Sequence, residues 1–212
     1  MKPPVKNYKQ AKYPEGDVTQ WFGENPELYA RWGLLHHNGI DIVNAHGTPL
    51  YAVEDARVVS IKDNPDGFGK HIRIRSDKKY DNKYRIWTYA HCSSFECKEG
   101  QQVKAGDHIA NMGNTGFVVS GATPFWEYNP YAGTHLHLGL RLVEEDASGW
   151  RYSGDIMKIT VLNYDNGVKG AVDPAPYLAD FEADGRRRKL LTLISLLNQV
   201  VVLLQRKKEL ST

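Results

Sequence analysis

Two histidines stand one residue apart in the alternating segment GTHLHLGLRL, residues 133–142. Because side chains in a β-strand alternate between faces, His135 and His137 would share one face and the leucines would occupy the other. On one face their Cα atoms lie about 6 to 7 Å apart, close enough for both imidazoles to reach one pocket. The alternative is the half-exposed polar face of an ordinary antiparallel strand.

A second cluster of polar residues occurs in LLHHNGIDIVNAHG, residues 34–47, where His37 precedes Asp41 by four positions. In a straight strand these two residues would lie about 13 Å apart, too far to bind one ion. Asn38 and Gly39 both tolerate positive φ, so the chain can turn or bulge between them and bring the pair together. His36 has the wrong phase to join this pair.

Two histidines and a carboxylate occupy three positions on a metal ion and leave others open, as catalytic zinc sites require. Non-haem Fe(II) oxygenases use a similar triad. The candidate ligands are His37, Asp41 and one of the two histidines of 133–142. The remaining histidine of that segment would then stand beside a metal-bound water.

A further histidine, His91, ends the strand-like segment RIWTYAHC, residues 85–92. Alternation predicts that Arg85, Trp87, Tyr89 and His91 share one face of this strand. A polar residue that caps the end of a strand is the competing interpretation of His91.

Short β-prone segments separated by turns make up most of the chain and predict a mainly β, antiparallel fold. The strand-like segments are residues 17–23, 48–64, 69–77, 84–92, 101–113, 133–143 and 157–167. One short helix is expected at 25–33, with Pro26 at its first turn and Gly33 at its end. Residues 116–132 form a long aromatic loop before the histidine segment, a length typical of functional loops.

The order of motifs HNGID, YAH, GNTG and HLHL resembles the lysostaphin/LytM-like zinc metalloendopeptidases of bacterial cell walls. The resemblance covers roughly residues 17 to 178 and ends near AVDPAPYL, similar to the terminal signature of that family. It implies an antiparallel β-sheet metallopeptidase domain that holds one Zn²⁺ ion.

Carried over residue by residue, the resemblance implies that three residues are zinc ligands and two form a catalytic pair. The ligands would be His37, Asp41 and His137, and the catalytic pair His91 and His135.

A tyrosine upstream of the first ligand often assists such sites, which makes Tyr29 a candidate. The chain departs from the family pattern at Leu138, where phenylalanine is usual, at Cys92, where leucine is common, and in a longer loop over 117–134. The first two departures affect packing, and the third affects substrate choice.

The implied function is zinc-dependent hydrolysis of peptide bonds in bacterial peptidoglycan, in the stem peptide or the cross-bridge. A non-catalytic cell-wall-binding, structural or amidase-activating module on the same fold is one alternative, although such relatives typically lack ligands that this chain retains. An Fe(II) oxygenase is another, but its usual ligand spacing is His-x-Asp/Glu, and His91 would have no role.

Composition and charge fit one globular domain with a smaller appendage. The chain has 212 residues, 41% of them hydrophobic and 25% charged. Residues 1–179 hold 20 basic and 21 acidic side chains, so a basic face for nucleic acid is not expected. We expect a flexible, solvated arm over 1–16, the peptidase domain over 17–179, and a linker and helix over 180–212.

The last segment changes character, because seven basic residues bracket an apolar run with heptad spacing from Leu190 to Leu204. As a helix, residues 190–205 would span roughly 24 Å, short of a bilayer core of about 30 Å. Self-association or packing on the domain is expected, with contact to a membrane surface as the alternative.

The N-terminus lacks the apolar core of a secretory signal peptide, so we expect a cell-wall enzyme delivered by another route, such as a phage lysis or virion-associated enzyme. Cys92 and Cys97 are too few for a disulfide framework and are expected to be unpaired.

Overall fold

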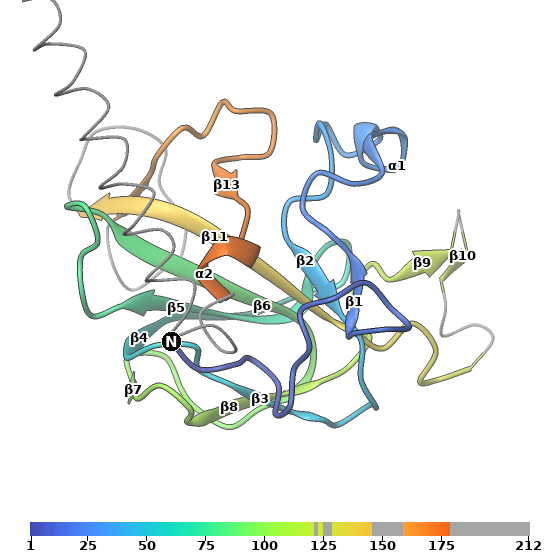
Figure 1. Ribbon diagram of the computed structural model, residues 1–212, viewed down its shortest axis with the longest axis horizontal. Coiled ribbons are helices and arrows are strands. Elements are labelled where there is room, and N and C mark those ends of the chain that lie inside the picture. The colour runs from blue at the N-terminus through green and yellow to red at the C-terminus, as the bar shows by residue number, and fades with distance from the viewer. Residues whose placement is uncertain (121–122, 125–128, 146–158, 179–212) are drawn as a thin grey trace, which may run out of the picture. The chain divides into compact units, whose positions relative to one another are not determined.

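Four long antiparallel strands lie side by side through the centre of the domain (Figure 1). In sheet order they are β11 (Leu136–Glu145), β6 (Tyr84–Phe95), β5 (Gly69–Ser76) and β4 (Ala56–Asn64). The structure is a computed structural model that describes residues 1–120, 123–124, 129–145 and 159–178. The predicted mainly antiparallel β fold is confirmed.

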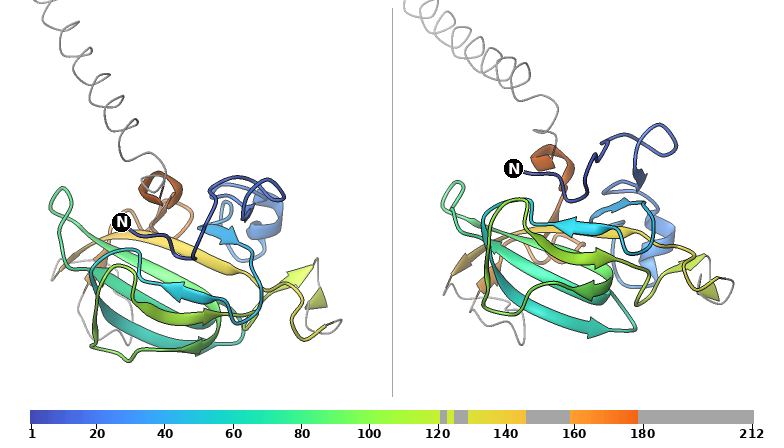
Figure 2. Two further views of the ribbon diagram at one scale, coloured as in Figure 1. Left: turned by 60° about the horizontal axis from the view of Figure 1, so that its bottom comes forward. Right: turned by 90° about the horizontal axis from the view of Figure 1, so that it is seen from below.

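Short strands extend this sheet on both sides. They are β1 (Val18–Gln20), β2 (Ile40–Ile42), β3 (Pro49–Tyr51), β7 (Gln102–Val103), β8 (His108–Met112), β12 (Ile159–Val161) and β13 (Ala171–Val172). The sheet path runs β1, β2, β11, β6, β5, β4, β7. β11 is therefore flanked by β2 and β6, and both views of Figure 2 show the yellow β11 beside the green β6.

Three smaller elements complete the described part of the chain. The predicted aromatic loop contains a hairpin of β9 (Val119–Ser120) and β10 (Thr123–Pro124). The predicted helix at 25–33 forms as α1 (Pro26–Ala30), and Gly33 follows it with a φ of 67°. A second helix, α2 (Ala175–Leu178), lies close to the end of the described residues.

The leucine face of β11 packs into the core, as its alternation predicts. Leu138 stands beside Tyr89 of β6, which stands beside Ile72 of β5, and all three side chains are fully buried. A second buried row consists of Leu140, Trp87 and Ile74. The opposite face of β11 is thereby left for the histidines.

The sequence predicts that alternate residues from Arg85 to His91 share one face of β6. This prediction is wrong for His91. Ala90 and His91 together oppose the single residue His71 of β5, which is a β-bulge. His91 also has a φ of 60°. This bulge breaks the alternation after Tyr89 and turns His91 away from the core, toward the histidines of β11.

The N-terminal segment differs from the solvated arm that the sequence predicts. Val5 and Tyr8 are only 1% and 7% exposed, and the Tyr51 backbone N–H donates to the carbonyl oxygen of Pro4 at 2.9 Å. The segment lacks an apolar run, but single apolar residues and backbone hydrogen bonds attach it to the domain. Most of 1–16 is therefore part of the folded unit.

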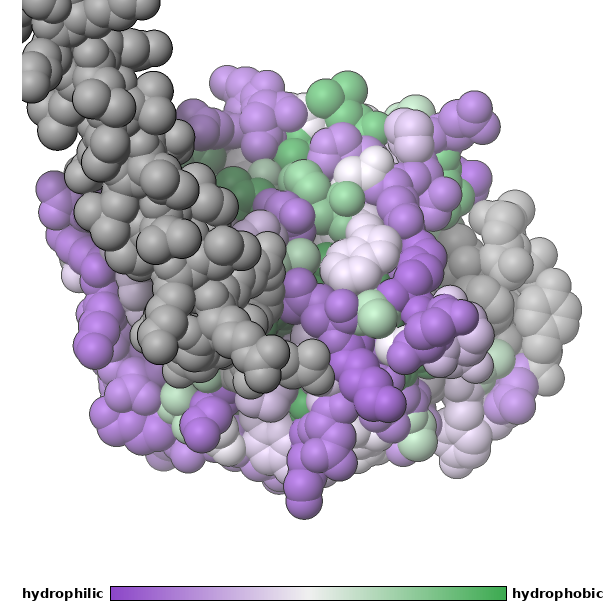
Figure 3. Space-filling view, viewed as in Figure 1, coloured by the Kyte–Doolittle hydropathy of each residue, from purple (hydrophilic) through white to green (hydrophobic). Residues whose placement is uncertain are grey.

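The surface seen in Figure 3 is mostly hydrophilic, with apolar residues gathered near the loops around α1 and before β13. These loops meet where the Leu35 N–H donates to the carbonyl oxygen of Gly167 at 2.9 Å.

Residues 1–178 form one compact unit. The predicted helix and self-association within 180–212 lie outside the described residues. None of the helices in the described part of the chain has the length and apolar character to span a membrane. Cys92 and Cys97 are both unpaired thiols, as expected.

Candidate functional site

Three side chains bring one potential ligand atom each to a single point. The Nε2 atom of His37 lies 3.1 Å from the Oδ1 atom of Asp41 and 3.0 Å from the Nδ1 atom of His137. The Nδ1 atom of His137 lies 3.0 Å from the same carboxylate oxygen. All three residues are buried. The structure therefore brings together the three residues that the family resemblance implied as zinc ligands.

The donor set and its spacing fit zinc. Imidazole nitrogens and a carboxylate oxygen are ordinary zinc ligands, and tetrahedral bonds of about 2.1 Å place two ligands roughly 3.4 Å apart. The observed separations of 3.0 to 3.1 Å are close to that value. Fe(II) accepts the same donor types, so the triad by itself does not choose between the two metals.

The register of β2 on β11 creates this cluster. Asp41 stands directly opposite His137 in the antiparallel pair, and His37 lies just before β2. The predicted convergence of His37 and Asp41 is confirmed, but its predicted cause is wrong, because neither Asn38 nor Gly39 has a positive φ.

Gly39 is required for space instead. A Cβ atom at this position would lie 2.7 Å from the Nε2 atom of His137 and 2.7 Å from the carbonyl oxygen of Leu138. Since real Cβ atoms essentially never approach other atoms that closely, any side chain at Gly39 would push β2 away from β11.

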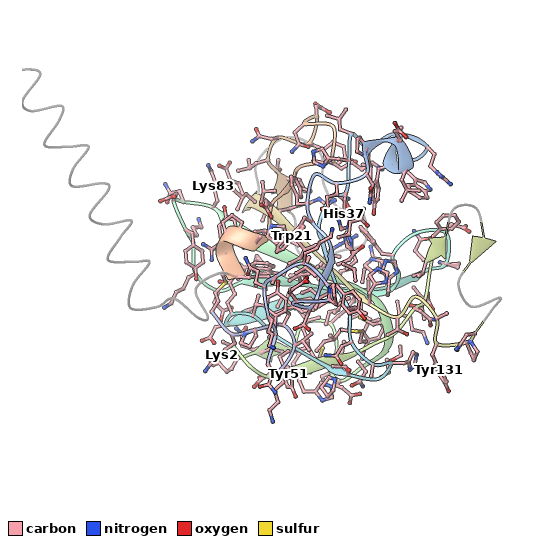
Figure 4. The ribbon with its side chains drawn as sticks, turned by 45° about the vertical axis from the view of Figure 1, so that its right-hand side comes forward. Lys2, Trp21, His37, Tyr51, Lys83 and Tyr131 are labelled. Carbon is pink, nitrogen blue, oxygen red and sulfur yellow. The ribbon has the colours of Figure 1, made fainter. Side chains whose placement is uncertain are left out.

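His37 is oriented by the residues around it. Its Nδ1 atom lies 2.9 Å from the carbonyl oxygen of Trp21, which makes Nδ1 the donor and leaves the Nε2 lone pair toward the cluster. Figure 4 shows Trp21 and His37 close together near the middle of the molecule. The ring of Tyr29 stacks on His37 at 5.2 Å, and its hydroxyl donates to Gln20, so Tyr29 lies at the site.

His91 and His135 lie beside the cluster with their rings 4.7 Å apart. The Nδ1 atom of His91 is 2.8 Å from the carbonyl oxygen of Thr115, and that of His135 is 2.7 Å from the carbonyl oxygen of Gly133. Each Nδ1–H therefore donates to the backbone, which leaves Nε2 as the acceptor. The Nε2 atom of His135 lies 3.8 Å from Asp41.

Burial and neighbouring charges shift the pKa values at the site. Burial alone would raise the pKa of Asp41, but His37 and His135 hold it well below its usual range. Burial alone would lower the pKa of His37, but the Asp41 carboxylate raises it above 6.5.

The other two buried imidazoles shift the opposite way. Burial, reinforced by His135 and His137, holds the pKa of His91 well below 6.5. Burial also lowers the pKa of His137 to about 4. Both rings are therefore neutral at neutral pH, the form that can accept a proton or bind a metal.

A groove with a volume of about 600 Å³ opens over these residues. Four aromatic side chains, Tyr29, Trp32, Phe68 and Phe117, are among its lining residues. The rings of Trp32 and Phe117 meet edge to face at 5.4 Å, although they come from loops more than 80 positions apart. The groove therefore gives access both to Asp41 and His137 and to the histidine pair.

The remaining histidines do not join the cluster. His36 contacts the backbone of His37, and His46 packs on Tyr131. His71 bonds to the carbonyl oxygen of Gly69, and His108 pairs with Asn111.

Sequence reasoning missed the groups that orient the site, which are the backbone carbonyls of Trp21, Thr115 and Gly133 and the ring of Phe68 stacked on His137. Backbone carbonyls carry no residue-type signal, so no motif could have revealed them.

The comparison with known protein families points to a metallopeptidase family for this fold and site. The sequence profile of Peptidase family M23 matches residues 35–148, more than half of the chain. The chain therefore belongs to peptidase family M23, and its resemblance to lysostaphin-like proteins is confirmed.

Two curated relatives and one solved structure illustrate the similarity. The chain is 31% identical over 109 residues to an uncharacterized metalloprotease of Haemophilus influenzae, covering 50% of this chain and 22% of that protein. It is 30% identical over 138 residues to the murein hydrolase activator NlpD of Escherichia coli, covering 65% of this chain and 29% of NlpD. The chain thus spans less than a third of the length of these relatives.

The structure of the antimicrobial peptidase lysostaphin from Staphylococcus simulans shares the fold, with a TM-score of 0.52 and 21% identity. The alignment covers 80% of this chain and 53% of lysostaphin.

Proposed function

We propose that this protein is a zinc-dependent endopeptidase that hydrolyses peptide bonds of bacterial peptidoglycan. The observation that carries the proposal is the arrangement of five residues, with His37, Asp41 and His137 as zinc ligands and His91 and His135 beside them. All of them except His37 line the groove. A structural zinc site normally has four protein ligands, whereas these three leave one position open. Two further histidines with free Nε2 atoms supply what hydrolysis needs, which is a route for protons.

One Zn²⁺ ion per domain would be held by His37, Asp41 and His137. When bound, zinc supplies Lewis-acid chemistry, since it lowers the pKa of water toward 7 and polarises a carbonyl group. Asp41 contributes a negative charge, because its carboxyl is ionised at neutral pH. The backbone carbonyl of Trp21 holds His37 in the tautomer that presents Nε2 to the ion.

His91 and His135 would move the protons of the reaction. In hydrolysis, water oxygen bonds to the carbonyl carbon, the C–N bond breaks, and a proton passes from the water to the amine nitrogen. His91 is neutral at neutral pH, and its Nδ1–H is fixed on Thr115, so Nε2 can accept this proton. His135 has the same backbone-fixed Nδ1 atom, and its ring lies 4.7 Å from that of His91, so His135 would hold or return the proton.

Peptidoglycan is the proposed substrate for two reasons. The relatives that the chain resembles include a murein hydrolase activator, and the solved structure with the same fold is named an antimicrobial peptidase. The groove is open and suits an extended peptide of small residues, as in the stem peptides and cross-bridges of the cell wall. The proposed place of action is therefore the cell wall, outside the cytoplasmic membrane.

A non-catalytic activator of cell-wall hydrolases is the second candidate. The similarity to the activator NlpD over 65% of this chain is the observation that favours it. An activator has no need of a complete ligand set with two oriented histidines, and this chain has both. We therefore rank catalysis first.

Digestion of purified sacculi separates the two candidates. The full chain, loaded with zinc, is incubated with sacculi of different cross-link chemistry, and the released muropeptides are identified by mass spectrometry with and without chelator. Catalysis predicts new peptide termini that appear only without chelator, and these termini name the bond. Release only in the presence of an added amidase would identify an activator and overturn the endopeptidase proposal.

A further inference from the structure

Three of the four histidines at the site have a nitrogen fixed by a backbone carbonyl, and the fourth does not. The fixed residues are His37, His91 and His135, whose Nδ1 atoms lie 2.7 to 2.9 Å from their carbonyl partners. The Nε2 atom of His137 is buried and has no hydrogen-bond partner among the described residues. If Nδ1 of His137 binds zinc, Nε2 must carry a hydrogen, and this buried N–H needs an acceptor.

A second buried polar group without a partner lies nearby. Thr88 of β6 stands directly opposite Gly139 of β11, and its side chain is fully buried. Within the described part of the chain the hydroxyl of Thr88 has no hydrogen-bond partner either. Burying two such groups unpaired would cost free energy, so a shared partner is expected.

The missing side chain of Gly139 leaves room for that partner. A Cβ atom on Gly139 would lie 3.7 Å from the Nε2 atom of His137, 3.7 Å from the Cβ atom of Thr88 and 3.8 Å from the carbonyl oxygen of Asn38. All three are ordinary van der Waals distances. The space in front of Gly139 is therefore bordered by the Nε2 atom of His137, the carbonyl oxygen of Asn38 and the side chain of Thr88, which carries the second unpartnered group.

We propose that His137, Thr88 and the carbonyl of Asn38 bind one ordered water molecule, and that Thr88 acts through this water as a positioning residue for the zinc ligand. The water accepts the Nε2–H of His137 and donates to the Asn38 carbonyl and to the Thr88 hydroxyl. These three hydrogen bonds are the usual number for a buried water. The proposal rests on the proposed zinc site, because it assigns Nδ1 of His137 as the ligand atom.

In this arrangement Gly139 leaves the space that the proposed water occupies. A methyl group at Gly139 fits without a clash but occupies the place of the water and offers no acceptor. A serine places the same Cβ atom there and adds a hydroxyl that would take over the hydrogen bonds of the water. The pair Gly139→Ala and Gly139→Ser therefore tests the hydrogen bond at nearly constant volume, and Thr88→Val with Thr88→Ser forms a second matched pair.

Zinc affinity of the full chain is the primary measurement, by competition with a chromogenic chelator. We expect Gly139→Ala and Thr88→Val to bind zinc about 10- to 100-fold more weakly than the native chain, the usual effect of losing an indirect partner of a ligand. Gly139→Ser and Thr88→Ser should stay within about threefold of the native affinity.

Two further measurements separate positioning from general destabilisation. Ile86→Val truncates a fully buried residue two positions from Thr88 on the same strand, and it should lower the melting temperature of the metal-free protein without changing zinc affinity. Nitrogen NMR of the zinc-loaded chain should show the hydrogen of His137 on Nε2 in the native protein.

The outcomes distinguish this proposal from the proposed function. If the native chain binds no zinc, both are overturned. Native zinc affinity in Thr88→Val and Gly139→Ala overturns the water site alone, and so does equal weakening by Ile86→Val. An effect of Thr88→Val without any effect of Gly139→Ala overturns the bridging water, since it would show a direct contact between Thr88 and His137.

Discussion

His135 and His137 stand two positions apart at the start of β11, yet their surroundings differ and suit different proposed roles. The Nδ1 atom of His135 is bonded to a backbone carbonyl, so only its Nε2 atom is available to the groove. His137 presents its Nδ1 atom to the carboxylate of Asp41 and to His37. Identical side chains on one face can thus act as a metal ligand and as a proton carrier.

Single substitutions at these two histidines should therefore have different effects. His137→Ala removes one of three proposed zinc donors, so zinc content and activity should fall together. His135→Ala should keep the zinc and lose turnover, by roughly 10²- to 10⁴-fold for a positioned acid or base. Zinc content by atomic emission and turnover on muropeptides check both, and His91→Ala should behave like His135→Ala.

The exposed His46 supplies the control, since His46→Ala should change neither zinc content nor turnover. Loss of zinc in His135→Ala together with retention in His137→Ala would reverse the two roles.

A buried histidine outside the site predicts how stability depends on pH. Burial lowers the pKa of His71 to about 4, while its Nδ1–H donates to the Gly69 carbonyl. Between this value and the unfolded value near 6.5, the unfolded chain binds more protons, so the free energy of unfolding falls as the pH falls.

His71→Gln removes this titration. When the pH falls from about 7 to about 4.5, the free energy of unfolding of the metal-free native protein should fall by roughly 2 kcal/mol more than that of the variant. Urea unfolding of both proteins at the two pH values measures the difference. Equal losses would show that the pKa of His71 is the same in the folded and the unfolded chain.

At the scale of elements, a close contact between two loops holds one wall of the groove. Gly69 and Gly116 both have positive φ, of 58° and 80°, and a Cβ atom on Gly116 would lie 2.1 Å from the backbone nitrogen of Gly69. The Phe117 N–H donates to the Gly67 carbonyl in the same contact. This contact places Phe117 and Phe68 at the groove.

Gly116→Ala should therefore destabilise the protein by about 3 kcal/mol or more, because it adds a backbone clash to the cost of positive φ. Gly47→Ala is the matched control, since Gly47 has a φ of 81° but nothing within 4 Å of its Cβ position. The control should cost about 1 kcal/mol. Thermal and urea unfolding compare the two, and equal costs would mean that the loops can separate freely.

At the scale of the whole molecule, residues 1–178 contain the sheet, the groove and every proposed site residue. The apolar segment from Leu190 to Leu204 carries heptad spacing, which is typical of association between helices. The proposed zinc site and the proposed association segment should therefore be separable.

Deleting residues 183–212 should leave zinc content unchanged and reduce self-association. Sedimentation of the full chain and of the truncated chain at equal concentration measures the change in mass. A monomeric full chain with no change on truncation would contradict the self-association hypothesis and favour packing of the tail on the domain. Loss of zinc on truncation would show that the proposed zinc site depends on the C-terminal segment.

Several features could be read from the sequence because they depend on local periodicity or residue chemistry. Alternation in 133–142 predicted a strand with a buried leucine face and a histidine face, and both faces are found. Residue chemistry also indicated His37, Asp41 and one of the two histidines of 133–142 as a candidate ligand set, and the family resemblance implied the full set of five. Steric and hydrogen-bonding rules act over a few residues, so a sequence records them directly.

Other features were decided by tertiary structure alone. The bulge that turns His91 into the groove arises from the pairing of β6 with β5, and the need for Gly39 arises from the approach of His137, almost 100 positions away. The packing of residues 1–16 likewise depends on surfaces formed elsewhere in the chain. The sequence by itself determined the strand pattern and the chemical groups, whereas contacts between distant segments decided their directions and spacings, because those contacts exist only once the sheet has assembled.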